Sequence, residues 1–558
     1  MRAGVRPAGV APLALLALAV TAGSLSVADD DADRVLDQIH PQALRAHIQF
    51  LADDLLEGRE AGTRGYQLAA NYVAAQFAAL GLQPAGSDGG YFQPVPLRTF
   101  EAVGSECSLV VIRDGKELAL TYGKDFAMAG DPLRAETSVT APVVFVGHGV
   151  TAPEAGYDDY AGVDARGKIV VLLQGAPASL PHNQRAYYSS SEVKWENAVA
   201  HGAVGLLGFM TPEAEKRLGW ETLVALVSSG GMRWLDQAGT PRPVSPEIRG
   251  TALLSAAALE ALFEGASASL ATVLADIRAG KPHPLELPVQ VKLRVVSRHG
   301  QLQSPNVVAV LPGSDPNLRQ EYVVYTAHLD HLGVGPPVEG DAIYNGATDN
   351  ASGTAMLLEM ARAFASLRQR PRRSVLFLAV TAEEKGLLGS DYFVHYPTIP
   401  VEGLVANVNL DGALMLHPLH DVVAFGAEHS SLAGVVEQAA HHLGLELSPD
   451  PMPEQVLFVR SDQYSFVRRG VPSVFVVEGL KTGDPKGDGR ALLTEWMETR
   501  YHTPQDDLSQ PLDFEAGATF ARVNFLIGYL VANQTPRPQW NAGDFFGEKF
   551  GLAAAGAP

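Results

Sequence analysis

The chain has 558 residues, of which 46% are hydrophobic and 19% are charged, close to the usual composition of globular proteins. At about 150 residues per domain, this length predicts two to four domains with substantial cores. The formal net charge is −20, from 62 acidic and 42 basic side chains. The composition therefore excludes a disordered chain and argues against nucleic acid or an anionic membrane as a partner.

The N-terminus has the pattern of an export signal. Arg2 and Arg6 precede the apolar run VAPLALLALAV at 10–20, and SVA at 26–28 has the small residues of a cleavage site. We therefore predict a signal peptide over residues 1–28 and a periplasmic or extracellular mature protein. An uncleaved anchor is the alternative, but the apolar run is shorter than the roughly 20 residues that a membrane span needs. No later run is long enough either, so we expect no stable membrane association.

The first part of the mature chain changes character near residue 95. Residues 42–82 are predicted to be helical, because apolar residues recur at i, i+3, i+4 and i+7 on both sides of the polar turn EGREAGTRG. From 95 to 300 the pattern becomes short β-rich runs, such as VVFVGHGV and GKIVVLLQG. Cys107, the only cysteine, lies in one such run, so a disulfide within the chain is excluded and a buried structural thiol is expected. The change in pattern predicts a separate β-rich unit.

After about residue 305 strands alternate with helices. Apolar runs at 321–328, 374–384, 404–412 and 471–479 are predicted strands, and 351–367 is a predicted helix. Strands that are apolar along their whole length indicate a mixed, mostly parallel sheet with helices on both faces. In such sheets the ligand crevice lies at the carboxyl ends of the strands.

Ionisable side chains follow three of these predicted strands. His328 ends the first, Glu383 and Glu384 end the second, and Asp411 ends the third. Neighbouring residues of an extended segment point in opposite directions, so the two glutamates cannot have the same role. Two carboxylates partly removed from water repel each other unless a cation is near. A divalent metal bound by one glutamate, with the other facing the reacting water, would resolve this; a solvated Glu-Glu turn is the alternative.

Further motifs supply the same chemistry. In AHLDHLG, Asp330 follows His328 at a spacing that suits a carboxylate holding the other ring nitrogen of a ligand histidine. Asp349 in GATDNASG precedes a predicted helix, and His502 lies in RYHTPQDD. Each motif alone also fits a strand-end histidine, an Asx turn, a helix cap or a loop histidine. Their joint occurrence at strand ends favours a metal site.

The donor set indicates the metal. Two imidazoles and three carboxylates without a thiolate suit Zn²⁺ first, and then Mn²⁺ or Co²⁺. Five donors are too many for one tetrahedral catalytic ion, but a bridging Asp would allow two ions about 3.5 to 4 Å apart. The predicted donors are His328, Asp349, Glu384, Asp411 and His502.

The motifs AHLDHLG, GATDNASG, TAEEKG, NLDG and YHTPQDD, in this order, resemble the co-catalytic dizinc aminopeptidase family, whose relatives include glutamate carboxypeptidases and glutaminyl cyclases. The segment LADDLLEGREAGTRG is similar to the first part of that family's domain, and the middle region resembles a protease-associated domain. The resemblance implies a zinc aminopeptidase fold interrupted by this smaller β-rich domain. The predicted division is a signal peptide (1–28), a first peptidase part (36–120), the protease-associated insert (121–290), the catalytic part (291–535) and a C-terminal tail (536–558).

The resemblance also implies roles for the site residues, with two zinc ions per chain. Asp349 would bridge the ions, His328 and Asp411 would complete one site, and Glu384 and His502 would complete the other. The peptide bond that follows the bridging Asp349 would be cis. Three further roles are implied: Asp330 orients His328, Glu383 is the general base for the water between the ions, and Tyr501 stabilises the oxyanion.

The sequence thus predicts an exported zinc metallo-aminopeptidase that acts on peptides with a free N-terminus. A one-zinc glutaminyl cyclase is an alternative, although the predicted insert argues against it. A non-catalytic binding protein on the same scaffold is a second alternative, but all five donors are present. Carboxypeptidase activity is a third, with Arg460, Arg468 or Arg469 binding the substrate carboxylate. Gln463 stands where many relatives have histidine, so we expect different polar contacts in that loop.

Overall fold

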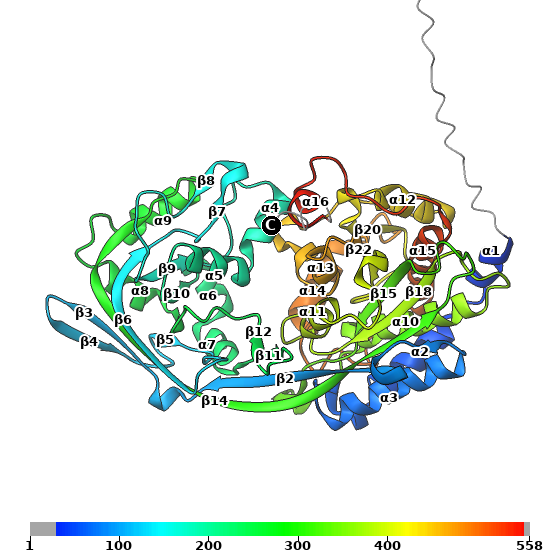
Figure 1. The fold of residues 1–558 in the computed structure, drawn as a ribbon, viewed down its shortest axis with the longest axis horizontal. Helices are drawn as coiled ribbons and strands as arrows, with labels where there is room; N and C mark the ends of the chain where they lie inside the picture. Colours follow the sequence, from blue (N-terminus) through cyan, green and yellow to red (C-terminus); the bar gives the residue numbers. More distant parts are fainter. Residues whose placement is uncertain (1–29, 552–558) are drawn as a thin grey trace, which may run out of the picture.

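The computed structural model describes residues 30–551, so the predicted signal peptide lies outside the described residues. The molecule has two lobes joined by a long antiparallel ribbon (Figure 1). One strand of the ribbon, β14 (Leu285–Leu311), runs through both lobes, and β2 (Phe92–Ala102) pairs with it between the lobes. No helix in residues 30–551 combines the length and apolar character needed to cross a membrane.

The lobe formed by the described residues outside 103–296 contains most of the predicted catalytic part and is named the catalytic lobe for that reason. It is built on a mixed sheet with a parallel centre. Strand β15 lies between β18 and β19 and runs parallel to both, and β22 continues the parallel group beyond β19. The C-terminal half of β14 is antiparallel to β18 at one side, and β20 is antiparallel to β22 at the other. The strands are β15 (Tyr322–His328), β18 (Ser374–Val380), β19 (Leu404–Asn409), β20 (Asp421–Phe425) and β22 (Ser473–Glu478).

Helices cover both faces of this sheet, as the apolar strands predicted. Side chains of β18 alternate between two clusters, with Phe377 in one and Leu378 in the other. The first cluster is closed by α2 (Pro41–Leu51), α3 (Arg64–Ala79), α10 (Ser352–Ala365), α12 (Leu432–His442) and α15 (Phe514–Asn533), and the second by α11 (Leu388–His395) and α13 (Gln463–Val467). The predicted fold class is confirmed, because a mixed sheet with a parallel centre is covered on both faces.

The second lobe, residues 103–296, has its own sheet and core. The sheet contains the N-terminal half of β14 and a parallel group of β6, β9, β10 and β13, with the pair β3–β4 at one edge. The strands are β3 (Ser108–Arg113), β4 (Lys116–Leu120), β6 (Glu136–Phe145), β9 (Ile169–Leu173), β10 (Gly205–Phe209) and β13 (Thr251–Leu254), and the short β5 (Phe126–Ala127) pairs antiparallel with β13. Its helices α8 (Ala256–Phe263) and α9 (Leu270–Arg278) lie on one face and α5 (Ser191–Ala200) on the other.

The start of this lobe differs from the predicted boundary at residue 120. The apolar cluster of the second lobe already includes Cys107, Leu109 and Val111, and β3 pairs with β14 inside this sheet. Cys107 is buried there, as its strand pattern predicted. These contacts favour a boundary near residue 103, because a strand belongs to the core that buries its side chains; the domain bounds themselves stay a prediction.

The lobes also touch through the C-terminal segment. Helix α16 (Phe545–Phe550) lies between the lobes, beside α4 (His182–Ser189) of the second lobe (Figure 1). Phe546 is buried against Phe458 of the catalytic lobe, with ring centroids 5.2 Å apart, and Phe545 lies 5.5 Å from Tyr187 of α4. The described part of the predicted tail is therefore a packed connection between the lobes.

A polar contact joins the lobes on another side. Asp391 of α11 accepts hydrogen bonds from Trp234 Nε1 and from Arg468 Nη2, each at 2.7 Å. Arg468 also binds Glu192 of α5 at 2.7 Å. The guanidinium of Arg468 is thus engaged by two carboxylates, which weakens the idea that it binds a substrate carboxylate.

Candidate metal centre

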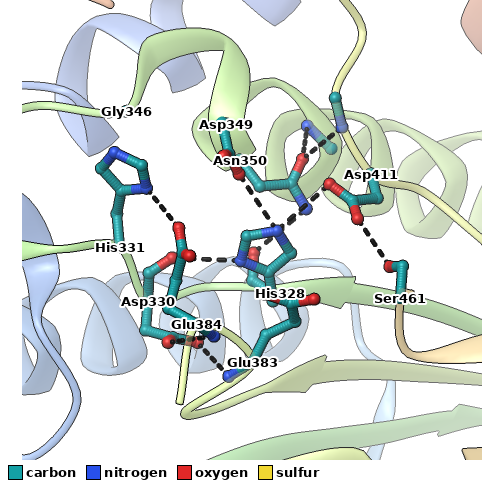
Figure 2. Close-up of polar contacts among 12 residues, drawn as sticks. His328, Asp330, His331, Gly346, Asp349, Asn350, Glu383, Glu384, Asp411 and Ser461 are labelled. Carbon is teal, nitrogen blue, oxygen red and sulfur yellow. Dashed lines mark hydrogen bonds and ion pairs between the residues drawn. The ribbon is translucent and has the colours of Figure 1, made fainter. Parts of the chain in front are cut away.

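The predicted donors meet at the carboxyl ends of the parallel strands. His328 is the last residue of β15 and lies beside Val380 at the end of β18. Ala382, with φ of 54°, turns the chain after β18, so that Glu384 faces the same edge. Figure 2 shows His328, Asp349, Glu384 and Asp411 converging on this edge. The placement follows from parallel strands in register, whose ends necessarily lie together.

The donors form two triples that share Asp349. Nε2 of His328 lies 3.3 Å from Asp349 Oδ1 and 3.2 Å from Asp411 Oδ1. Nε2 of His502 lies 3.2 Å from Asp349 Oδ2 and 3.3 Å from Glu384 Oε2. Each oxygen of Asp349 therefore faces a different histidine.

These separations fit two zinc ions. Two ligand atoms at zinc bond lengths of 2.0 to 2.1 Å on a tetrahedral ion are about 3.3 Å apart. All four nitrogen-to-oxygen distances in the two triples lie between 3.2 and 3.3 Å, close to this ligand separation and at the long end of the hydrogen-bond range. The residues present thus match the donor types and spacing of a two-zinc site bridged by Asp349.

The charges in the metal-free centre are strongly coupled. Burial opposes the protonated form of His328, but Asp411 and Glu383 raise its pKa well above the usual range. For His502, burial again opposes protonation, yet Asp349 and Glu384 raise its pKa to about 10. The pKa of Asp349 is held well below its usual range by the two histidines, against the opposing effect of burial. Without metal, protons on the imidazoles therefore balance the carboxylates.

Glu383 stands apart from both triples. Burial, with added repulsion from Glu384 and Asp411, raises the pKa of Glu383 well above its usual range. In contrast, the pKa of Glu384 falls to about 2, because hydrogen bonds from His331 and His502 outweigh burial and the nearby Asp349. The two adjacent glutamates thus have opposite protonation tendencies, as different roles require.

Asp330 supports the centre in a different way from the one predicted. Nδ1 of His328 lies 3.1 Å from the main-chain oxygen of Asp330, and not against its carboxylate. The carboxylate instead accepts the main-chain N–H groups of Glu383 at 3.1 Å and Glu384 at 3.3 Å. Asp330 therefore orients the histidine through its backbone and fixes the turn of the two glutamates through its side chain.

His331 is a site residue that the sequence analysis missed, although it lies in the motif AHLDHLG. It is fully buried, and its Nδ1 lies 2.7 Å from Glu384 Oε1. His331, Asp349 and Glu384 also lie close enough together to hold a metal ion. However, 2.7 Å is a hydrogen-bond length and shorter than the roughly 3.3 Å between two ligands of one tetrahedral zinc. The distances favour His331 as a hydrogen-bond partner of Glu384.

Asp349, the predicted bridging residue, is held by Asp506, a carboxylate that the sequence analysis also missed. Asp506 is buried and accepts hydrogen bonds from the main-chain N of Thr348 and of Asp349, both at 3.0 Å, and from Thr348 Oγ1 at 2.6 Å. The peptide bond between Asp349 and Asn350 is cis, which confirms that prediction. Asp506 lies four residues after His502 in YHTPQDD. One motif therefore supplies both the histidine that faces the Asp349 carboxylate and the carboxylate that binds the Asp349 main chain.

Two further predicted positions lie near the donors. The ring of Tyr501 stacks on His502 with centroids 3.8 Å apart, and burial together with the site carboxylates raises the pKa of its phenol. Its oxyanion role stays a prediction. Gln463 is buried, accepts from Asn409 Nδ2 and donates to the oxygen of Phe458, each at 2.8 Å, so its polar contacts are satisfied within the protein.

Comparison with known proteins identifies the catalytic lobe. Residues 306–527 match the model of peptidase family M28, a span that contains all five predicted donors. This part of the chain is therefore similar to peptidase family M28, in agreement with the resemblance seen in the sequence.

Similar proteins carry peptidase names. A "Probable zinc metalloprotease" of Pyricularia oryzae is 31% identical over 261 residues, 42% of this chain and 50% of that protein. Aminopeptidase YwaD of Bacillus subtilis is 29% identical over 216 residues, 37% of this chain and 40% of that protein. The chain spans about half the length of the curated relatives it matches, or less.

The solved structure of an aminopeptidase from Aneurinibacillus sp. strain AM-1 has a similar fold. It superposes with a TM-score of 0.52 at 20% identity and covers 91% of this chain and 97% of its own. Both lobes of the present fold therefore have a counterpart among known structures.

Proposed function

We propose that the protein is an exported zinc aminopeptidase that removes N-terminal residues from peptides. The observation that carries this proposal is the pair of donor triples sharing Asp349, each with separations near 3.3 Å, beside a glutamate that belongs to neither. The names of the relatives, zinc metalloprotease and aminopeptidase, support the same class.

The donors would divide between two ions. His328, Asp349 and Asp411 would hold one, and His502, Asp349 and Glu384 the other. Bound zinc supplies Lewis acidity, which polarises a peptide carbonyl and lowers the pKa of water. Asp330 and His331 keep Glu384 in place, through its main-chain N–H and through Oε1.

Glu383 would move the proton. It stands outside both triples, and its carboxylate can accept a proton from the attacking water and return it to the leaving amine. Burial, together with repulsion from Glu384 and Asp411, raises its pKa in the metal-free centre, which supports a role in taking up a proton. A buried group that both accepts and releases a proton suits hydrolysis of an amide, whose nitrogen must be protonated to leave.

The acidic surroundings suit a substrate with a free, protonated N-terminus. Glu383 could contact that ammonium group as well as the reacting water. Two alternatives are less well supported. A carboxypeptidase needs a free cation that faces the substrate carboxylate, but Arg468 is engaged by Asp391 and Glu192. The other two candidates, Arg460 and Arg469, are exposed at the surface. A one-zinc cyclase does not need donors spaced for two ions.

Activity on defined substrates would test the proposal. Purified protein should hydrolyse amino-acid p-nitroanilides and free peptides, lose this activity with a chelator and regain it with zinc. N-terminally blocked peptides are the control and should stay intact. Cleavage of blocked peptides from their C-terminus, or conversion of N-terminal glutamine without hydrolysis, would overturn the proposal.

Export is part of the proposal and rests on residues 1–28. N-terminal sequencing of protein recovered from outside the cytoplasm should show a chain that starts at Asp29. Recovery of the whole chain with its first residues intact in the cytoplasm would contradict it.

A further inference from the structure

A buried arginine lies beside the metal centre and takes no part in the scheme above. Arg59 is 1% exposed and ends a tight turn in which Glu57, Gly58 and Arg59 all have positive φ, of 48°, 67° and 52°. A Cβ added to Gly58 would lie 2.4 Å from the oxygen of Gly333, so this turn is pressed against the chain that follows His331. Arg59 lies outside the residues that match the peptidase family model.

The guanidinium binds main-chain oxygens on both sides of a hairpin. Nε donates to Leu329 at 3.0 Å, Nη1 to Asn345 at 2.6 Å and Nη2 to Gly346 at 3.0 Å, and Nη1 also donates to Leu51. Between Leu329 and Asn345 the chain forms the hairpin of β16 (Gly333–Val338) and β17 (Asp341–Tyr344). One planar group thus ties the two ends of the hairpin together.

Those two ends carry metal donors. Leu329 directly follows His328, and Gly346 lies three residues before Asp349. The main-chain oxygen of Arg59 also accepts from the N–H of His331 at 3.3 Å. Arg59 therefore fixes the backbone next to His328 and the backbone that leads to Asp349.

The positive charge of Arg59 also favours bringing the site carboxylates together. Burial lowers its pKa to about 10, against the opposing effect of the site carboxylates Asp506, Asp330, Asp349 and Glu384. Arg59 therefore remains charged at neutral pH. A buried cation facing these groups reduces their mutual repulsion before any metal binds.

We propose that Arg59 is a positioning residue that sets the spacing of His328 and Asp349 and so prepares the centre for zinc. The inference rests on the proposed zinc-dependent function. A planar guanidinium can serve several carbonyls at fixed angles, whereas the single ammonium of lysine cannot. Hydrogen-bond partners of metal ligands are typically worth 10- to 100-fold in metal affinity, which sets the scale of the expected effect.

The matched control is Arg373, another buried arginine of the same lobe. It is 0% exposed and donates to the main-chain oxygens of Val531, Gln534 and Thr535 and, at 2.6 Å, to Glu321 Oε2. It directly precedes β18 and so lies at the end of that strand away from the predicted donors. Arg59→Lys and Arg373→Lys both keep a cation and both lose a fork that binds carbonyls. They differ in position: the guanidinium of Arg59 binds the segments that carry His328 and Asp349, and that of Arg373 does not.

The experiment compares both variants with the wild-type protein. Zinc dissociation constants come from competition with a chromophoric chelator, and the stability of the metal-free protein from urea unfolding. Both variants should be destabilised, but only Arg59→Lys should bind zinc more weakly, by about 10- to 100-fold. Unchanged zinc affinity in Arg59→Lys, or an equal loss in Arg373→Lys, would overturn the inference.

A milder variant serves if Arg59→Lys does not fold. Nδ2 of Asn345 donates to the oxygen of Ala52 at 2.9 Å and to Asp54 Oδ1 at 2.8 Å. This uncharged side chain thus joins the segment that ends at Arg59 to the end of the hairpin, as Arg59 does. Asn345→Ala should lower zinc affinity in the same direction and by less, and an unchanged affinity would then count against the inference. If wild-type protein itself binds no zinc, the proposed function fails, and not the assignment of Arg59 alone.

Discussion

The two lobes both contain parallel strands, but they end those strands with different chemistry. In the catalytic lobe, β15, β18 and β19 lead to His328, Glu383 and Asp411. In the second lobe, β9, β10 and β13 lead to Gln174, Met210 and Ser255, none of which is charged. The same sheet geometry thus gathers several ionisable groups at strand ends in one lobe, whereas in the parallel group of the other only β6 leads to one within three residues, His148.

Buried charges of the second lobe serve its own backbone. Lys194 donates to the oxygen of His148 at 2.5 Å, and Asp159 accepts from the main-chain N of His148 and Val150. The carboxylates of the metal centre instead face imidazole nitrogens at 3.2 to 3.3 Å, a separation that also suits two ligands of one zinc ion. Side chains at strand ends, and not the sheet, therefore distinguish the catalytic lobe from the second lobe.

The largest effect should come from separating the two adjacent glutamates. Glu383→Gln should keep both zinc ions and lower kcat by about 10²- to 10⁴-fold, because the general base is lost while both donor triples remain. Glu384→Ala should lose zinc from the triple that contains His502. Zinc content and kcat, measured under saturating zinc, distinguish the two. A zinc-depleted Glu383→Gln beside a Glu384→Ala with two ions would reverse the roles.

The coupled charges predict a steep dependence of zinc affinity on pH. In metal-free protein the pKa of His502 is about 10 and that of His328 is also raised, so both imidazoles carry a proton at neutral pH. Zinc binds only the neutral nitrogen, so each site must release a proton. Affinity should therefore rise with pH, by about tenfold per pH unit for each proton displaced, until pH exceeds these pKa values.

Competition with a chelator between about pH 6 and 8 measures this dependence, and calorimetry in buffers of different ionisation enthalpy counts the released protons. A zinc affinity that is constant across this range would show that the imidazoles are already neutral without metal.

His331 should affect one ion and spare the other. His331→Ala removes the hydrogen bond to Glu384 Oε1, so zinc affinity at the triple with His502 should fall by about 10- to 100-fold. The triple of His328 and Asp411 should keep its ion. Titration of metal-free protein with zinc, with His441→Ala on the surface of α12 as the control, resolves the two affinities. Equal weakening of both sites would contradict this role.

The smallest effect is expected where the second lobe meets the catalytic lobe. Trp234→Phe removes the hydrogen bond from Nε1 to Asp391 and leaves the bond from Arg468. The free energy of unfolding should fall by about 1 to 3 kcal/mol, while zinc content and kcat stay unchanged. Urea unfolding and a standard assay measure both. A large fall in kcat would mean that the second lobe shapes the active site directly.

Much of the fold and site could be predicted from the sequence. Apolar strands in alternation with helices indicated the sheet covered on both faces, and four of the predicted donors follow a strand or precede a helix. His502 lies in a turn after the helix Gly489–Thr499, and only its motif pointed to it. The structure brings His328, Asp349, Glu384, Asp411 and His502 together in two triples. Local periodicity and residue type were sufficient here, because the strands are parallel and their ends must meet.

Other features depend on contacts between residues far apart in the chain, which no local pattern encodes. The hydrogen bond from His331 to Glu384, the support of Asp349 by Asp506 and the contacts of Arg59 join segments separated by 53, 157 and up to 287 residues. The pairing of β3 with β14 in the second lobe and the packing of α16 beside α4 likewise join segments that are far apart in the chain. The candidate metal donors could be predicted from the sequence, because donor chemistry and a place at a strand end or in a motif are local properties. The groups that hold those side chains in position became visible only in the folded chain, because hydrogen bonds between distant segments exist only once the chain has closed on itself.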